Sequence, residues 1–261
     1  LRDRGAVAPG KRADLVTFGR LNRPYIRDVW VEGEPVARDG RLLRPWAAPK
    51  VRGGVGRLRV PPSALERLAV PAKGRRIRAI RAFPDQIVTG TEILEARVEG
   101  GQAVPDPGRD ILKLSLFERH RGTGNVGVGF VRGFGLRRGA LASTVAHDAH
   151  NLIAVGASDA AIRTAAEAAI RMGGGMVAVR GKRVLADLPL PLWGLMSERP
   201  AAEVAARKRA LDRAARALGS SLPDPFLTLS FLALSVIPTL KISDRGLVDV
   251  TRFQRVPLFV R

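Results

Sequence analysis

The stretch ILKLSLF-ERHRGTGN-VGVGFV, residues 111–131, decides the fold of this chain. Its two apolar runs, 111–117 and 126–131, predict two strands, and the Gly-rich segment between them predicts a loop beside a strand or a tight turn between the two. Residues 122–127 match the spacing G-x-G-x-x-G, and Asp148 follows about twenty residues later, as in a dinucleotide-binding fingerprint. In that fingerprint the glycines open a helix. Because further glycines and β-branched residues follow here, we reject a dinucleotide site.

The regions on either side of this stretch predict one unit over residues 76–261, a β-sheet with packed helices of the mixed α+β class. We expect a helix over 160–172, capped by Ser158 or Asp159 and ended by glycines 173–175, and a second helix over 200–218, with Gly219 as its stop. A hairpin is expected around Gly181-Lys182. The remaining predicted strands are 77–83, 87–89, 93–98 and 152–155, with the hairpin arms at 176–180 and 183–187.

The first 45 residues predict a separate all-β piece. A short strand is expected over 13–18, and 28–37 predicts two strand arms around a Gly33-Glu34 turn, closed by a second turn at Asp39-Gly40. Such a piece is too small to bury its own core, so it needs strands from elsewhere. Residues 46–75 are rich in Pro, Gly and Arg and predict a linker, with a short helix at 62–68.

Composition narrows the chemistry that this chain can perform. There is no Cys, which excludes disulfides and thiolates, so any metal ligands would be carboxylates or the three His residues. No run is long and apolar enough for a membrane span, and we expect a cytoplasmic protein without a membrane partner. Lys and Arg exceed Asp and Glu by 20, which invites a nucleic-acid partner. Only residues 73–81 are densely basic, and they lack aromatic residues for base stacking, which disfavours that partner.

The densest cluster of polar side chains is STVAHDAHN, residues 143–151. Two His, an Asp and an Asn lie in five positions after an apolar strand, and on a helical turn His147 and His150 would face the same side. They could hold a divalent metal with a carboxylate, although most sites need three or four ligands. Alternatively, His and Asp form an acid–base pair, or the cluster orients a substrate. A Ser-His-Asp triad is disfavoured because no G-x-S-x-G turn surrounds Ser143. The alternative to function is a polar loop that caps neighbouring elements.

These observations give the candidate site. We predict His147, Asp148 and His150 as catalytic residues, with His147 and His150 as candidate metal ligands. The candidate substrate-binding residues lie in the Gly-rich segment 118–125 and in the polar cluster 143–151. They are His120, Glu118, Asn125, Ser143 and Asn151. A third stretch, 187–197, is more typical of a rigid packing loop, although its Trp193 could stack on a flat heterocycle.

The sequence also resembles a known family. GAVAPGKRADLV at 5–16 and VWVEGE at 29–34 are similar to the closing β-sandwich segment of amidohydrolase-superfamily enzymes. A longer series resembles the C-terminal domain of adenine deaminases in content and order. It consists of ERH at 118–120, GTGN at 122–125, GFGL at 133–136, the 143–151 cluster, MGGG at 172–175, LPLP at 188–191, DPF at 224–226 and SFLAL at 230–234. The likeness covers nearly the whole chain and is weakest over 44–76.

The resemblance implies hydrolytic deamination of adenine to hypoxanthine and ammonia, in purine salvage. It also implies a divalent metal pair, manganese or iron, held in a TIM-type barrel by a His-x-His motif and further His and carboxylate ligands. This chain has no His-x-His, so the barrel and the main metal ligands are expected upstream of Leu1. The His147 loop would reach the barrel mouth, to contact substrate or complete the metal environment. We expect a homo-oligomer, and little or no deaminase activity from the chain alone. The alternatives are a purine-binding module without chemistry and a basic nucleic-acid-binding protein.

Overall fold

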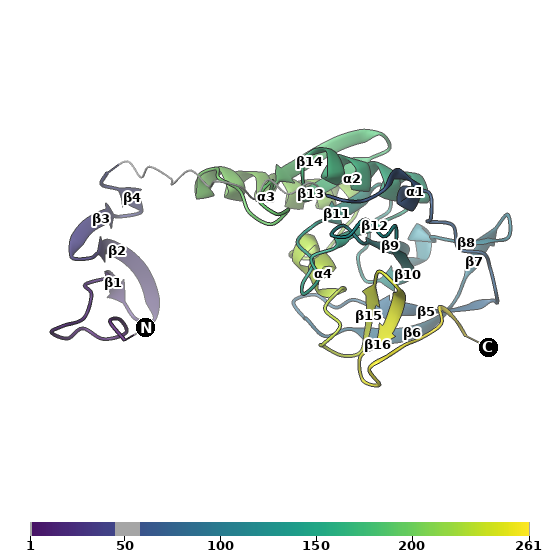
Figure 1. The fold of residues 1–261 in the computed structure, drawn as a ribbon, viewed down its shortest axis with the longest axis horizontal. Coiled ribbons are helices and arrows are strands. Elements are labelled where there is room, and N and C mark those ends of the chain that lie inside the picture. The colour runs from purple at the N-terminus through teal and green to yellow at the C-terminus, as the bar shows by residue number, and fades with distance from the viewer. Residues whose placement is uncertain (1, 45–57, 261) are drawn as a thin grey trace. The chain divides into compact units, whose positions relative to one another are not determined.

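The chain has a mixed α+β fold built mostly of strands. The computed structural model describes residues 2–44 and 58–260, and the chain divides into two compact units, Leu1–Val51 and Arg52–Arg261 (Figure 1). The described residues form several sheets and four α-helices, without a closed barrel. This confirms the predicted fold class. None of the described helices is long and apolar enough to cross a membrane.

The first unit is a four-stranded antiparallel sheet. Its strands follow chain order, β1 (Leu15–Arg20), β2 (Arg23–Val31), β3 (Glu34–Arg38) and β4 (Arg41–Leu42). The turn between β2 and β3 is Glu32-Gly33, one residue earlier than the predicted Gly33-Glu34. Both turn residues have positive φ, 55° and 85°, which is the geometry that two-residue hairpins require. The turn at Asp39-Gly40 lies where the sequence predicts it.

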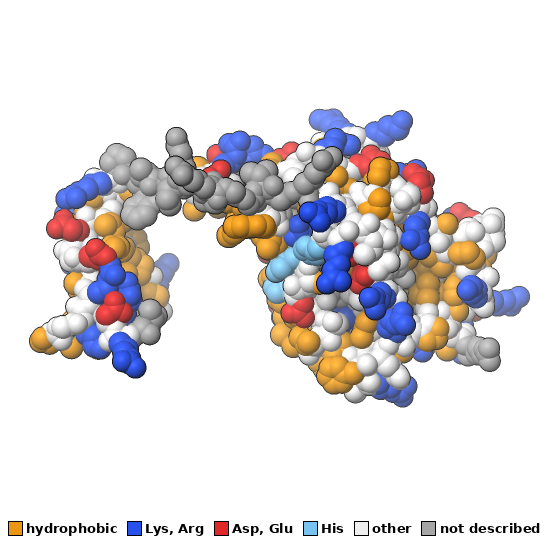
Figure 2. All heavy atoms as spheres, in the orientation of Figure 1, with side chains coloured by type: hydrophobic (Ala, Val, Ile, Leu, Met, Phe, Trp, Pro, Cys, Tyr) orange, Lys and Arg blue, Asp and Glu red, His pale blue; other side chains and the backbone are white. Residues whose placement is uncertain are grey.

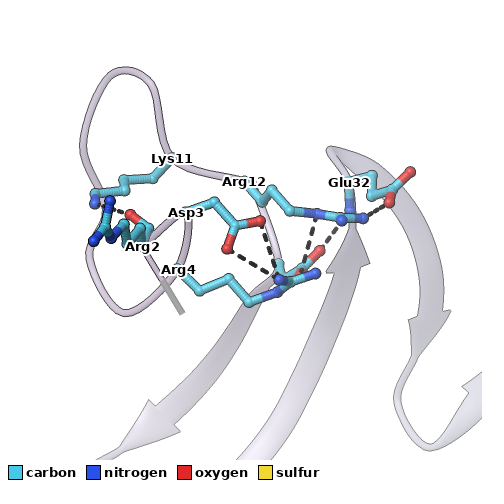
Figure 3. Close-up of polar contacts among 7 residues, drawn as sticks. Arg2, Asp3, Arg4, Lys11, Arg12 and Glu32 are labelled. Carbon is cyan, nitrogen blue, oxygen red and sulfur yellow. Dashed lines mark hydrogen bonds and ion pairs between the residues drawn. The ribbon is translucent and has the colours of Figure 1, made fainter.

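Ion pairs fix the chain that leads into this sheet (Figure 3). The Arg4 guanidinium contacts the carboxylates of Asp3 at 3.1 Å and Asp14 at 3.0 Å, and Arg12 pairs with Glu32. Asp14 also accepts a hydrogen bond from the backbone N–H of Glu32 at 2.8 Å. These contacts tie the entering loop to the β2–β3 turn, so local charges position a sheet that has little core of its own.

The second unit is organised around a nine-stranded sheet. The order is β14-β13-β11-β12-β9-β10-β5-β18, with β6 on the other side of β5, and every pairing is antiparallel except that of β10 with β5. The strands are β5 (Arg76–Arg81), β6 (Gly90–Glu95), β9 (Ile111–Phe117), β10 (Val126–Arg132), β11 (Ala140–Ser143), β12 (Leu152–Gly156), β13 (Gly175–Arg180), β14 (Arg183–Pro189) and β18 (Phe259–Val260).

Helices cover both faces of this sheet (Figure 1), and β9 is buried along its whole length. One face carries α2 (Asp159–Arg171), which packs through its alanines, together with the short α1 (Pro62–Leu65). The opposite face carries α3 (Ala201–Leu218) and α4 (Pro225–Phe231). As predicted, Ser158 caps α2, accepting from the N–H of Ala161, and Gly219 ends α3 with φ 117°. The smaller elements are β7 (Arg97–Glu99), β8 (Gln102–Val104), a 3-10 turn at Pro107–Arg109, β15 (Leu240–Ser243), β16 (Gly246–Asp249) and β17 (Gln254–Arg255).

Several predicted elements need correction. Residues 87–89 form no strand, because Thr89 instead exchanges backbone hydrogen bonds of 3.0 Å with Pro238 and Thr239, far away in sequence. The predicted strand 93–98 is divided, since β6 ends at Glu95 and β7 begins at Arg97. The helix predicted over 62–68 ends at Leu65. Within the predicted linker, residues 46–57 lie outside the described residues.

Candidate functional site

The register of the central strands places the segments 118–125 and 143–151 at the same edge of the sheet. Phe117, the last residue of β9, pairs with Val126 at the start of β10 and with Leu152 at the start of β12. The residues that follow β9 and those that precede β12 therefore share an edge. Figure 2 shows the histidine side chains in one patch on this face. We call His120, His147, Asp148 and His150 the histidine edge.

The His147 loop is a tight turn rather than the helical turn that would place His147 and His150 on one side. Asp148 and His150 have φ values of 70° and 47°, and the N–H of His150 donates to the carbonyl of Ala146 at 2.8 Å. Helix α4 supports the loop from the side. The N–H of His147 donates to the carbonyl of Ser230 at 3.1 Å, and its ring stacks on Phe231 with centroids 4.3 Å apart. The His147 ring is thus held in one orientation.

A buried arginine connects this loop to the 192–196 loop. The Arg119 guanidinium donates to the carbonyl of His150 and, at 2.9 Å, to that of Trp193. Gly194 makes this approach feasible, because a Cβ there would lie 2.8 Å from Arg119 Nη1, and its φ of 75° favours glycine. Arg119 therefore fixes the distance between the two loops.

His120 closes the edge from the other side. Its Nε2 lies 2.6 Å from the carbonyl oxygen of Ala149. Since a carbonyl oxygen only accepts, Nε2 carries the proton and donates. The structure thus links the segment after β9 directly to the His147 loop.

Three non-glycine residues at or beside the histidine edge have left-handed backbone conformations. Asp148, His150 and Trp193 have φ values of 70°, 47° and 54°. Such conformations cost free energy and persist where the surrounding structure enforces them, often at functional sites. Trp193 is also half exposed, although it is one of the largest apolar side chains. The backbone geometry supports a binding or catalytic site at the histidine edge.

Electrostatics favour a neutral imidazole at His150. Burial lowers the pKa of His150, and electrostatic interactions with Arg119, His147 and His120 lower it further, against the opposing effect of Asp148. At neutral pH the ring is therefore uncharged and can accept a proton or a hydrogen bond. The Nδ1 atoms of His147 and His150 are buried without a hydrogen-bond partner in the described part of the chain. Two ring nitrogens are thus left for another group to use.

Glu118, a predicted substrate-binding residue, has its carboxylate occupied by its own loop. It accepts from the backbone N–H groups of His120, Arg121 and Thr123 at 2.5, 2.7 and 2.9 Å, and from the Thr123 hydroxyl at 3.0 Å. Burial would raise its pKa, but these hydrogen bonds outweigh burial and lower the pKa of Glu118 to about 2. This geometry suits a residue that orders the loop carrying His120.

The other predicted binding residues divide into two groups. Asn151 and Ser143 lie at the histidine edge but shape its backbone: Asn151 Oδ1 accepts from the N–H of Arg119 at 3.4 Å, and Ser143 Oγ accepts from the N–H of Val145 at 3.0 Å. Asn125 points elsewhere, and its amide donates to Asp244 at 3.0 Å. The structure therefore does not bring the Asn125 side chain to the other site residues.

The donor set at the histidine edge does not form a complete metal site. Nowhere in residues 2–44 and 58–260 do three His, Cys, Asp or Glu side chains come together in a way that could hold a metal ion. Two buried imidazole nitrogens are one or two ligands short of the three or four that protein metal sites use.

Sequence reasoning assigned no role to three residues that build the site. Arg119 was visible only as a cation beside His120, Phe231 lies far away in sequence, and Thr144 is one position before the apolar part of the loop. The Thr144 hydroxyl accepts from the N–H of Gly175 at 2.7 Å and donates to the carbonyl of Gly194 at 2.6 Å. The one available signal was the position of Arg119, two residues after the end of the predicted strand 111–117.

Comparison with known proteins identifies relatives of this chain. Residues 86–254 match the family described as the adenine deaminase C-terminal domain. The chain is 46% identical to an adenine deaminase from Desulfatibacillum aliphaticivorans over 259 residues, which cover 99% of this chain and 45% of the relative. It is 47% identical to the adenine deaminase of Methanothrix thermoacetophila, with 100% of the chain and 45% of the relative covered. An adenine deaminase 2 from Carboxydothermus hydrogenoformans is also 47% identical, with 99% and 45% covered. The chain spans about 45% of the length of these curated relatives.

Proposed function

This chain belongs to the adenine deaminase family, because its residues 86–254 match the C-terminal domain of that family, and we propose that it is the C-terminal part of an adenine deaminase. The reaction is the hydrolytic conversion of adenine to hypoxanthine and ammonia, in purine salvage. The observation that carries a role for this chain is the convergence of its three histidines on one sheet edge, held there by Arg119 and by left-handed backbone.

The histidine edge acts on the purine by hydrogen bonding and proton transfer. Deamination adds water to the carbon that bears the amino group, removes a proton from that water and delivers one to the departing nitrogen. A neutral His150, with Nδ1 unpartnered, can accept a proton or a hydrogen bond. His147, whose ring is fixed by Phe231, orients the purine, and the exposed Asp148 carboxylate balances the charge that develops on the imidazoles.

The other candidate residues support this edge. His120, anchored to the Ala149 carbonyl, is proposed to contact the substrate, and Ser143 and Asn151 hold the loop that presents His147 and His150. Glu118 keeps its proposed place at the site in a changed role, as the residue that orders the His120 loop.

The remainder of the enzyme supplies what this chain lacks. We propose that a divalent metal, manganese or iron, and the barrel that binds it belong to the part of the relatives that this chain does not match, and that the whole enzyme is a homo-oligomer. The metal would lower the pKa of its bound water and so provide hydroxide at neutral pH.

Ammonia release from adenine tests this division of roles. With added manganese, the isolated chain is expected to release no ammonia above background, and turnover at a rate near that of a whole relative would contradict the proposal. Calorimetry with adenine on the same chain tests the alternative of a purine-binding module. Tight binding by the isolated chain would favour that module over an edge that is completed by the barrel.

A further inference from the structure

The sheet splits beside β5 and forms a groove at the split. Strand β10 pairs with the second half of β5, where Phe130 lies opposite Ala79. Strand β18 pairs with the first residues of β5, where Phe259 lies opposite Ile77. Because β6 occupies the other edge of β5, β10 and β18 lie along the same edge. The two strands diverge there and leave a groove of about 1150 Å³.

The walls of this groove combine positive charge with apolar surface. Its cations are Lys73, Arg75, Arg76 and Arg78, and none of the described residues that line it is an Asp or a Glu. The guanidinium of Arg78 donates to the carbonyl of Pro257, which fixes its place at the split. Apolar side chains from three segments supply the rest of the lining, namely Val70, Val128, Leu258 and Phe259.

Two of these cations, Lys73 and Arg75, remain available to a ligand. Lys73 and Arg75 are exposed, and within the described ranges neither they nor Arg78 form an ion pair with a carboxylate. A ligand with several negative charges would therefore replace water at these cations without first breaking a salt bridge. The same residues belong to the densely basic stretch 73–81, for which deamination of a neutral purine gives no reason.

We propose that this groove binds a nucleoside polyphosphate. Lys73, Arg75 and Arg78 match the phosphates, and the apolar wall with the Phe259 ring matches a planar base. Small-molecule sites are mostly apolar clefts of roughly 300–1,000 Å³ with a few convergent polar groups. The groove, at about 1150 Å³, is somewhat larger and has room for a whole nucleotide. The groove shares no lining residue with the histidine edge, and the proposal does not rest on the deaminase function.

Calorimetry with UTP on the intact chain tests the site. A pyrimidine nucleotide is used because it does not imitate adenine at the histidine edge, so the two proposals can fail separately. We expect UTP to bind, and the double variant Lys73→Ala/Arg75→Ala to weaken binding by about tenfold or more, because two charge-assisted contacts are removed. The matched control, Arg209→Ala/Arg213→Ala, removes the same charge from exposed positions on α3 and should change affinity by less than about twofold.

Two further probes separate the phosphates from the base. Inorganic tripolyphosphate should bind more weakly than UTP, and Phe259→Leu should weaken UTP while leaving tripolyphosphate unchanged, with circular dichroism used to confirm the fold. Absence of UTP binding would overturn the proposal. So would equal losses in the groove and control variants, or equal affinity for UTP and tripolyphosphate. A short oligouridylate that binds far more tightly than UTP, with steep salt dependence, would identify a nucleic-acid surface instead.

Discussion

Substitution of Glu118 by Gln should destabilise the second unit although it removes no apolar contact. The carboxylate accepts three backbone N–H groups and one hydroxyl, and its pKa falls from 4.5 to about 2. At about 1.36 kcal/mol for each pKa unit, this shift corresponds to at most roughly 3 kcal/mol of preference for the ionised form in the folded state. Because the Gln amide keeps one acceptor oxygen, we expect a loss of about 1–3 kcal/mol in the free energy of unfolding at neutral pH.

The same shift fixes how the effect depends on pH. A carboxyl whose pKa is lower in the folded state contributes stability that is fully present above the unfolded pKa near 4.5 and is lost as pH falls toward 2. The stability difference between the wild-type chain and Glu118→Gln should therefore shrink from neutral pH toward about pH 3.

Urea unfolding followed by far-UV circular dichroism measures both quantities. The control is Glu167→Gln, at a half-exposed position on α2 whose carboxylate lies 3.7 Å from Arg171, and it should change stability by less than about 0.5 kcal/mol. The reasoning fails if Glu118→Gln is as stable as the wild-type chain at neutral pH, or if its deficit does not change with pH.

Three other substitutions test separate parts of the structure. Gly194→Ala should lower thermal stability by about 1–2 kcal/mol, because its Cβ would press on Arg119 in a left-handed backbone, and an unchanged Tm would contradict that contact. Ser158→Ala should cost about 1 kcal/mol in urea unfolding through loss of the α2 cap, whereas Thr164→Ala on the same helix should cost less. Burial lowers the pKa of Lys241 to about 8 from 10.5, so the unfolded chain binds more protons between those values. The wild-type chain should then gain up to about 3 kcal/mol relative to Lys241→Met as pH rises through that window, and a constant difference would contradict a charged, buried lysine at neutral pH.

The elements that sequence predicted well are those whose signal is local. Strand β9 is a mostly apolar run, interrupted by Lys113 and Ser115, and is buried throughout, and α2 has a serine cap at one end and glycines at the other. By contrast, α4 is only seven residues of mixed apolar and hydroxyl side chains, so its periodicity is too short to detect. The strand predicted over 87–89 is missing because Thr89 forms its backbone hydrogen bonds with Pro238 and Thr239, and no local pattern reveals partners so far away in sequence.

The candidate site shows the same limit. His147, Asp148 and His150 were found because they crowd into one short segment, and the register of β9 and β12 brings His120 to them. Their backbone conformation and the role of Arg119 depend on contacts with α4 and with the 192–196 loop, which follow from the tertiary structure alone. Asn125 was grouped with His120 by proximity in sequence, but its side chain turns toward Asp244.

The most direct test joins this chain to the part of the Methanothrix thermoacetophila relative that it does not match, and measures kcat/KM for adenine. The joined enzyme is expected to release ammonia, and His150→Ala within it should lower kcat/KM by about a hundredfold or more, the range of a proton-transfer group. Arg209→Ala, at an exposed position on α3, should leave kcat/KM unchanged. An inactive joined enzyme would contradict the proposed place of this chain, and a His150→Ala enzyme within about twofold of its parent would contradict a role for the histidine edge in catalysis.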